Sequence, residues 1–264
     1  MFDIAIPTIT LGIIGLLLGA LLAVASIIFK VETDERIPKI EECLPGANCG
    51  GCGYAGCSAY AAAIVNDNAP INLCNVGGQT AQNNIAVIMG VEAGAFVPKK
   101  AVVRCGGTCE AAQTKFEYDG IKSCAAAALV GGGFKSCAFG CLGFGDCIKA
   151  CNNNAITIEN GIAKVDYSKC GGCGSCVIAC PKNIIELIPQ KNNVVVNCVS
   201  RDKGAIVRKN CEVGCIGCKM CEKACGVGAI TVNDNVAVID YDKCTNCGEC
   251  VLKCPAKCLE KTQM

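Results

Sequence analysis

The chain opens with a long apolar run, and shorter apolar and polar segments alternate along the rest. From Ile4 to Phe29 no residue carries a charge. At ~1.5 Å of rise per residue this run reaches ~39 Å, more than the ~30 Å hydrocarbon core of a bilayer. The pattern therefore predicts a transmembrane helix over residues 1–30. The alternative is a signal peptide, but no basic residue precedes the run and it is longer than an ordinary h-region.

Beyond this run the pattern divides the chain into modules that differ in their helix and strand signals. Apolar residues at helical spacing predict helices near 58–66 and 79–90. The boundaries that we expect are a cysteine-rich module over 31–98, a connecting segment over 99–136, a first repeat unit over 137–190, a connector over 191–214 and a second repeat unit over 215–264.

The last two units are copies of one another. A shift of 74 residues places Cys137 on Cys211 and Cys170 on Cys244 without a gap. In the first copy, Asn160-Gly161 is a two-residue hairpin signal between two short apolar segments. Each copy therefore reads as a cysteine loop, a hairpin and a second cysteine loop with short helices. The expected fold class is α+β, with one N-terminal transmembrane helix, a small cysteine-rich module and two tandem units resembling bacterial ferredoxins.

Cysteine dominates the chemistry that the composition allows. The chain of 264 residues holds 27 cysteines and no histidine, and its net charge is +1. Without histidine there is no His-ligated zinc or haem, no Rieske centre and no Ser-His or Cys-His catalytic pair. The near-neutral charge argues against nucleic-acid binding. An odd cysteine count with many close spacings argues against disulfides, and thiolate ligands favour a reducing compartment.

The strongest motif is a four-cysteine run with the spacing of bacterial ferredoxins. It begins at Cys244 and ends at Cys254-Pro255, and its C-x2-C-x2-C-x3-C-P pattern binds [4Fe-4S] clusters. The alternative is zinc, but zinc sites usually pair two C-x2-C knuckles across a spacer. Runs of the same spacing are Cys170, Cys173, Cys176, Cys180 and Cys215, Cys218, Cys221, Cys225.

In two-cluster ferredoxins the fourth cysteine of each run ligates the other cluster, and this rule assigns ligand sets. The expected sets are Cys215, Cys218, Cys221 with Cys254; Cys244, Cys247, Cys250 with Cys225; and Cys170, Cys173, Cys176 with Cys151. A further set needs Cys141, Cys147 and Cys180, but Phe144 stands at its middle position. We expect Cys137 to replace the missing ligand; the alternatives are a lost cluster or one with three irons.

A separate set precedes these units, in a glycine-rich loop. Its expected ligands are Cys49, Cys52, Cys57 and Cys74, with zinc as the alternative occupant. Five [4Fe-4S] clusters are therefore expected. A sixth could be drawn from Cys105, Cys109, Cys124, Cys198 and Cys211, which otherwise would be buried thiols. Cys43 and Cys258 are expected to have no ligand role.

The motifs together resemble a known family. The block Cys43-Leu-Pro-Gly-Ala-Asn-Cys-Gly-Gly-Cys-Gly-Tyr-Ala-Gly-Cys57, the segment Cys-Leu-Gly-Phe-Gly-Asp-Cys147 and the paired ferredoxin runs are similar to the B subunit of the Rnf ion-translocating ferredoxin:NAD oxidoreductase, in its longer, cluster-rich form. The likeness covers nearly the whole chain. It implies a subunit of an oxidoreductase, a translocase, that accepts electrons from soluble ferredoxin and relays them to other membrane and peripheral subunits.

The expected location is the cell membrane, crossed once, because basic residues follow the apolar run and so place the cluster-bearing domains on the cytoplasmic side. No self-contained catalytic site is visible, and no nucleotide-binding fingerprint supports a self-sufficient oxidoreductase. The remaining alternatives are an electron-relay subunit of another membrane oxidoreductase and a non-catalytic cluster sensor.

Overall fold

The computed structural model describes the backbone of residues 2–28 and 34–262, and the side chains of residues 12–25 and 34–262. Helix α1 (Phe2–Ile28) covers the apolar run. Among the residues described, no helix combines the length and apolarity that a membrane crossing requires. The expectation of a transmembrane helix over residues 1–30 is therefore wrong.

Three helices around one apolar core form the N-terminal module. They are α2 (Arg36–Cys43), α3 (Cys57–Asn66) and α4 (Gly78–Met89). The helices expected near 58–66 and 79–90 correspond to α3 and α4. Ile40 and Tyr60, from α2 and α3, are buried in this core with Ile85 of α4. The Tyr60 hydroxyl donates to the Pro70 carbonyl (2.7 Å) and accepts from the Leu73 amide (3.1 Å), which fixes the loop before Cys74.

The first repeat unit is built on the predicted hairpin. Strands β2 (Ile156–Glu159) and β3 (Ile162–Val165) pair antiparallel, with Glu159 opposite Ile162. Asn160 and Gly161 form the turn with φ of 47° and 76°, the two positive values that a type I′ turn requires. Short helices α6 (Asp146–Lys149) and α7 (Ser175–Ala179) carry cysteines on either side of the hairpin.

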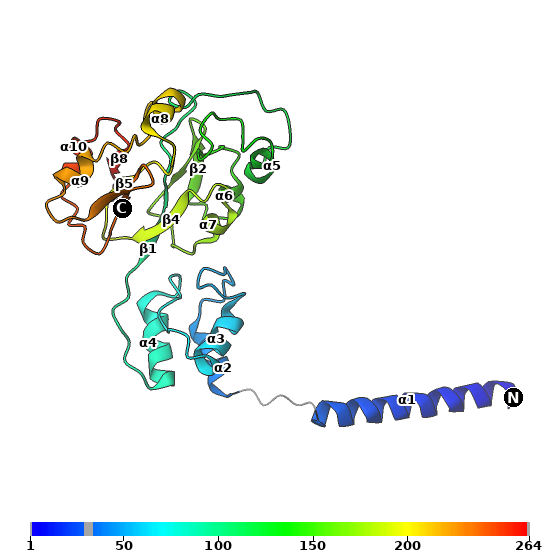
Figure 1. Ribbon diagram of the computed structural model, residues 1–264. Helices are drawn as coiled ribbons and strands as arrows, with labels where there is room; N and C mark the ends of the chain where they lie inside the picture. Colours follow the sequence, from blue (N-terminus) through cyan, green and yellow to red (C-terminus); the bar gives the residue numbers. More distant parts are fainter. Residues whose placement is uncertain (1, 29–33, 263–264) are drawn as a thin grey trace.

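The second repeat unit has the same plan, as the repeat predicts. Strands β6 (Ile230–Asn233) and β7 (Val236–Ile239) form its hairpin, and helices α9 (Met220–Ala224) and α10 (Glu249–Leu252) flank it. Asp234 and Asn235 make the turn, again with positive φ at both positions. The described part of the chain is thus mixed α and β, and the two units lie side by side above the N-terminal helices in Figure 1.

Each unit gains a second small sheet from a segment outside its repeat. Strand β1 (Lys99–Val103) pairs antiparallel with β4 (Ile185–Pro189), and β5 (Val194–Val196) pairs with β8 (Leu259–Lys261). The connecting segment 99–136 also supplies helix α5 (Cys124–Leu129), and the connector 191–214 supplies α8 (Gly204–Asn210). These segments therefore take part in the cores of the units instead of merely joining them.

Arg104 and a small apolar cluster join the two units. The Arg104 guanidinium forms an ion pair with Glu186 (3.1 Å) and donates to the Ala237 carbonyl (3.3 Å), so it reaches from the first unit to the second. Val102 and Ile188, from the β1–β4 sheet, are buried in one apolar cluster with Val195 of β5. The arrangement fixes the spacing between the cysteine sets of the two units.

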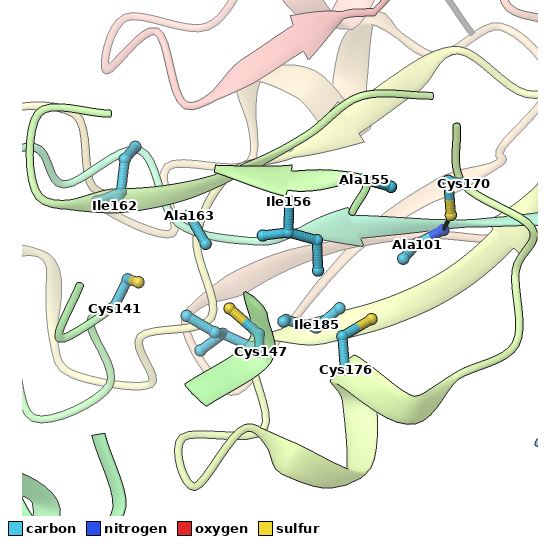
Figure 2. Packing of buried hydrophobic residues seen from close by; sticks show 11 residues of the cluster. Ala101, Cys141, Cys147, Ala155, Ile156, Ile162, Ala163, Cys170, Cys176 and Ile185 are labelled. Carbon is cyan, nitrogen blue, oxygen red and sulfur yellow. Dashed lines mark hydrogen bonds between the residues drawn. The ribbon is translucent and has the colours of Figure 1, made fainter. Parts of the chain in front are cut away.

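Cysteines are also part of the core of each unit. Figure 2 shows Cys141, Cys147, Cys170 and Cys176 among the aliphatic side chains of the first unit. Ile156, from the hairpin, lies between them. A core in which sulfur atoms take the place of large apolar side chains explains how the chain folds with few aromatic residues.

Candidate metal centres

Most of the described cysteines lie in groups of four, and four of these groups surround separate cavities. In the described part of the chain, four cavities are each lined by at least four cysteines. Two more groups of four are recognisable from the mutual influence of their thiols on pKa values. The described cysteines therefore form six groups of four, one more than the five sets that the spacing assigns.

The N-terminal group contains the four cysteines that the sequence indicates. Cys49, Cys52, Cys57 and Cys74 line one cavity, together with Cys173 of the first repeat unit. Asn48 accepts a hydrogen bond from the Cys57 amide (2.7 Å) and so holds the start of α3 over the loop. The Cys74 sulfur accepts from the Gly77 amide (3.3 Å), and burial raises the pKa of the Cys74 thiol.

The group near Phe144 is completed by Cys124. One cavity is lined by Cys124, Cys141, Cys147 and Cys180. Burial, together with the neighbouring thiols of Cys141, Cys124 and Cys180, raises the pKa of Cys147 to about 12. Phe144 itself packs edge-on against Phe134 (centroids 5.6 Å apart), which draws the connecting segment over this unit.

Asp146 ties the helix of Cys124 to the helix of Cys147. Its carboxylate accepts from the Ser123 hydroxyl (2.9 Å) and from the Ala125 amide (2.9 Å), at the first turn of α5. Although partial burial opposes ionisation, these hydrogen bonds hold the pKa of Asp146 below its usual value. The carboxylate therefore serves as a cap for α5, supplied by another element.

Cys137, the expected substitute for the missing ligand, lies in a different cavity. That cavity is lined by Cys105, Cys137, Cys198 and Cys211. The difference has a physical reason: an isolated bridge pairs Ala112 with Cys211 and thereby draws the connecting segment onto the second half of the chain. Cys105, Cys198 and Cys211 belong to the pool that the sequence offers for a sixth cluster, and the structure adds Cys137 to them.

This additional cavity has the features of a cluster cradle. A Cβ atom at Gly107 would lie 3.2 Å from the Ala112 side chain and in van der Waals contact with the sulfurs of Cys211 (3.5 Å) and Cys105 (3.7 Å), so this glycine lies directly beside two of the thiols. Lys135, buried beside it, donates to the Gly107 carbonyl (2.7 Å). Burial raises the pKa of Cys198 to about 11 and raises that of Cys137 as well.

The three remaining groups bring together the thiols of three expected sets. Burial and the other three thiols of the set together raise the pKa of Cys176 to about 12, that of Cys221 to about 11 and that of Cys250 above its usual value. The neighbours are Cys170, Cys173 and Cys151 for Cys176; Cys215, Cys254 and Cys218 for Cys221; and Cys244, Cys247 and Cys225 for Cys250. The last group also lines one cavity.

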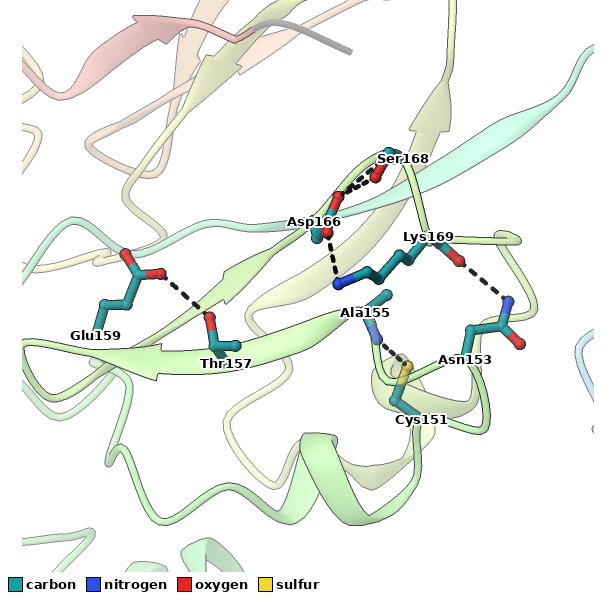
Figure 3. A network of polar contacts seen from close by, with 8 residues as sticks. All are labelled: Cys151, Asn153, Ala155, Thr157, Glu159, Asp166, Ser168 and Lys169. Atoms are coloured by element: carbon teal, nitrogen blue, oxygen red, sulfur yellow. Dashed lines mark hydrogen bonds and ion pairs between the residues drawn. The ribbon is translucent and has the colours of Figure 1, made fainter.

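Backbone amides point at several of these sulfurs in a repeated geometry. The Ala155 amide donates to Cys151 (3.3 Å), as Figure 3 shows, and the Ala229 amide donates to Cys225 at the same distance. Amide donors to thiolates stabilise the charged form, which is the form that ligates iron. The donor set, the amides and the glycine-lined space fit [4Fe-4S] clusters. Among the described residues, no three cysteine or acidic side chains lie close enough together to hold a single ion.

Three cysteines stand outside the six groups. Cys43 donates to the Lys39 carbonyl (3.2 Å) within α2, and Cys109 is exposed. Cys258 is buried, with its sulfur 3.6 Å from that of Cys254. From the sequence we expected no ligand role for Cys43 and Cys258, whereas Cys109 remained in the pool for a sixth cluster.

Family comparisons match the same segments. Residues 44–76 match the family described as "Putative Fe-S cluster", residues 163–186 match "4Fe-4S binding domain" and residues 214–258 match "4Fe-4S dicluster domain". These matches show that the chain holds iron–sulfur clusters of the 4Fe-4S type.

Similar proteins extend the likeness to nearly the whole chain. The B subunit of the Na(+)-translocating ferredoxin:NAD(+) oxidoreductase complex of Acetobacterium woodii is 50% identical over 97% of this chain and 77% of its own length. The B subunit of the ion-translocating oxidoreductase complex of Methanosarcina acetivorans is 43% identical over 94% of this chain and 94% of its own length. The B subunit of the proton-translocating ferredoxin:NAD(+) oxidoreductase complex of Clostridium ljungdahlii is 44% identical over 94% of this chain and 88% of its own length. The chain therefore belongs to the family of B subunits of Rnf ion-translocating ferredoxin:NAD oxidoreductase complexes, in which it is an iron–sulfur electron-transfer subunit.

Proposed function

We propose that the chain holds six [4Fe-4S] clusters and relays electrons from reduced ferredoxin through them to the other subunits of the complex. The observation that carries the number is the grouping of 24 of the 27 cysteines into six sets of four. Compared with the sequence assignment, Cys124 takes the place expected for Cys137, and Cys137 joins Cys105, Cys198 and Cys211. Every set then has the four thiolates that a cubane requires.

The residues around each set suit outer-sphere electron transfer. When bound, a [4Fe-4S] cluster supplies a one-electron redox centre. The thiolates fix its position, the amides of residues such as Ala155 and Ala229 donate to ligand sulfurs, and burial keeps water away from ligands such as Cys176 and Cys221. No acid, base or nucleophile is needed, since no proton or group is transferred. The chain thus contributes spacing and tuning of potential to the reaction.

Exposure of ligands favours the second repeat unit as the place where ferredoxin delivers electrons. Cys218 and Cys247, one from each set of that unit, are exposed, whereas every cysteine of the two sets in the first unit is buried or only partly exposed. Because electron tunnelling weakens steeply with distance, an external donor transfers fastest to a centre near the surface. The names of the relatives from Acetobacterium woodii and Clostridium ljungdahlii include ferredoxin, which supports it as the donor class.

Mixing experiments test this function directly. Purified chain, loaded with clusters and kept anaerobic, is mixed with reduced ferredoxin, and bleaching of the visible cluster absorbance is followed by stopped flow. We expect rapid bleaching with ferredoxin and none with NADH alone, because no nucleotide-binding motif is present. Clusters that dithionite reduces but reduced ferredoxin does not would contradict the proposed donor.

We infer further that the cluster-bearing modules work at the cytoplasmic side of the cell membrane, together with the other subunits. Thiolate ligation of iron favours a reducing compartment, and ion translocation in the relatives' names favours assembly at a membrane. Cell fractionation tests this. The chain should sediment with membranes when the other subunits are co-expressed. Recovery only in the supernatant, with the other subunits present in the pellet, would contradict it.

A further inference from the structure

The N-terminal module contacts the first repeat unit through the glycine loop of its own cysteine set. A Cβ atom at Gly51 would overlap the Cys173 carbonyl oxygen and lie 2.8 Å from the Cys173 carbonyl carbon. Gly51 has no left-handed φ in the structure, so close approach, not backbone conformation, is what requires glycine here. Cys173 accordingly lines the cavity of the N-terminal set as well as belonging to its own set.

Asn75, directly after the ligand Cys74, connects the same two loops by hydrogen bonds. Its side-chain amide donates to the carbonyls of Gly171 (2.8 Å) and Gly172 (3.1 Å), which lie between Cys170 and Cys173. Its carbonyl oxygen accepts from the Lys99 amide (3.0 Å), at the start of β1. One side chain thus joins a ligand loop of the N-terminal module, a ligand loop of the first unit and the strand that leads between them.

The interface beside this contact is open. A cavity of about 360 Å³ separates Leu73 and Phe96 from Leu187 of β4. Few other groups in this region can therefore resist a tilt of one module on the other. The contacts of Gly51 and Asn75 are placed to set the distance between the two cysteine sets.

We propose that Gly51 and Asn75 are positioning residues that hold the N-terminal set of Cys49, Cys52, Cys57 and Cys74 against the Cys173 loop, so that electrons cross between the two modules at this point. With clusters bound, the step would be the transfer of one electron, which would oxidise the centre held by Cys151, Cys170, Cys173 and Cys176 and reduce the N-terminal centre. No bond forms or breaks and no proton moves. The inference rests on the proposed function, because both sets must hold clusters.

The experiment uses the full chain loaded with clusters, with Gly51→Ala, Asn75→Ala and Asn75→Asp as variants. Asn75→Asp keeps a side-chain oxygen that accepts from the Lys99 amide but removes the N–H groups that donate to the carbonyls of Gly171 and Gly172. Samples are mixed with dithionite, frozen after increasing times and examined by electron paramagnetic resonance. The N-terminal signal is assigned as the one missing from Cys52→Ser. We expect its reduction to slow about 10- to 100-fold, the usual effect of losing an outer-shell partner, with iron content and midpoint potential unchanged.

Two matched controls separate positioning from general damage. Asn153→Ala removes a side-chain hydrogen bond to the Lys169 carbonyl (3.2 Å), seen in Figure 3, next to the same ligand loop but within the first unit. Gly226→Ala adds a methyl group beside the ligand Cys225, where no atom lies within 4 Å. Both should reduce their N-terminal cluster at the rate of the unaltered chain.

Several results would overturn the proposal. Unchanged rates of reduction of the N-terminal cluster in the three variants would show that Gly51 and Asn75 do not set the distance between the two cysteine sets. Loss of iron, a shifted potential, or equal slowing in the two controls would show a structural role only. Because dithionite is the reductant, these outcomes do not depend on ferredoxin. Failure of the proposed function would instead appear as missing cluster signals in the unaltered chain or as no reaction with ferredoxin.

Discussion

The cavity that Cys124 or Cys137 lines depends on contacts made by residues elsewhere in the chain. Phe144 stands where the repeat would place a ligand, and its ring packs with Phe134 and Tyr118 of the connecting segment. That packing holds α5 against the first unit, where Cys124 enters its cavity. Spacing alone could not show this, because Cys124 is 17 residues before Cys141. The local signal in the sequence was Ser123, directly before Cys124, because serine is a preferred N-cap residue and so marks the start of α5.

Alanine at either position should remove one cluster, but a different one. Cys124→Ala and Cys137→Ala should each lose about four irons, because each set loses one thiolate of a cubane. Electron paramagnetic resonance should show the Cys124→Ala defect in common with Cys141→Ala, and the Cys137→Ala defect in common with Cys198→Ala. Cys43→Ala, outside the sets, should keep all its iron. A shared defect of Cys137→Ala and Cys141→Ala would restore the assignment made from spacing.

Cys258 is a thiol where the equivalent half-repeats have aliphatic side chains. Ala155, Ile184 and Ala229 occupy the corresponding positions, four residues after a ligand cysteine. The Cys258 thiol is buried with its sulfur 3.6 Å from that of Cys254, and as a hydrogen-bond partner it lowers the pKa of Cys254 and of Cys215, two expected ligands of one set. An S–H donor near ligand sulfur favours the reduced, more negative state of a cluster.

Removing this donor should lower one midpoint potential. Cys258→Ala should shift the potential of the cluster of Cys215, Cys218, Cys221 and Cys254 downward by about 20–65 mV, equivalent to ~0.5–1.5 kcal/mol for one hydrogen bond and one electron. Redox titration followed by paramagnetic resonance measures it. Cys258→Ser keeps a donor and should shift less. An unchanged or raised potential in Cys258→Ala would refute the tuning role.

At the scale of elements, local signals predicted the hairpins, whereas the other strands form by pairing between segments that are far apart in the chain. Asn160-Gly161 indicated the β2–β3 turn, and the repeat carried this prediction to β6–β7 although the turn residues there are Asp234 and Asn235. Strands β1 and β5 were missed inside segments expected to connect. Their partners lie far along the chain, so no hairpin signal marks them. This explains why the boundaries at 99–136 and 191–214 do not separate independent units.

Asp146, which joins α5 to α6, should be the most sensitive residue in that link. Asp146→Ala should lower the free energy of unfolding by about 1–3 kcal/mol, because the Ser123 hydroxyl and the Ala125 amide lose their acceptor. Denaturant titration of the cluster-loaded chain measures the loss, with iron release as a second readout. Asp119→Ala, at an exposed position of the connecting segment that carries α5, should stay within about 0.5 kcal/mol. Equal free energies of unfolding for the two variants would show that the hydrogen bonds of Asp146 to the start of α5 do not stabilise the fold.

At the scale of the whole molecule, ligation and folding are linked. Buried ligands such as Cys147 and Cys221 lie inside the apolar clusters of the two units, as Figure 2 shows for the first. Without clusters, each set leaves thiols around an open cavity instead of a filled core. The sequence indicated this dependence through its many cysteines and few aromatic residues, whereas the expected membrane span was not found in the described structure.

Removal of iron should therefore unfold the repeat units. Anaerobic chelation should abolish most of the β signal in circular dichroism and increase the hydrodynamic radius in gel filtration, because metal-binding free energy is also folding free energy in such domains. Adding iron and sulfide back should reverse both changes. An iron-free chain with a native-like spectrum and radius would show that the apolar clusters suffice without ligation.

The central claim is that six sets of four thiolates each hold a cubane. Iron, acid-labile sulfide and zinc are measured together on anaerobically purified, cluster-loaded chain. We expect about 24 irons and an equal amount of sulfide per chain, with almost no zinc and paramagnetic signals on reduction. About 20 irons would mean that one of the six sets is not a site. A colourless chain that carries zinc or oxidised cysteines would contradict the claim altogether.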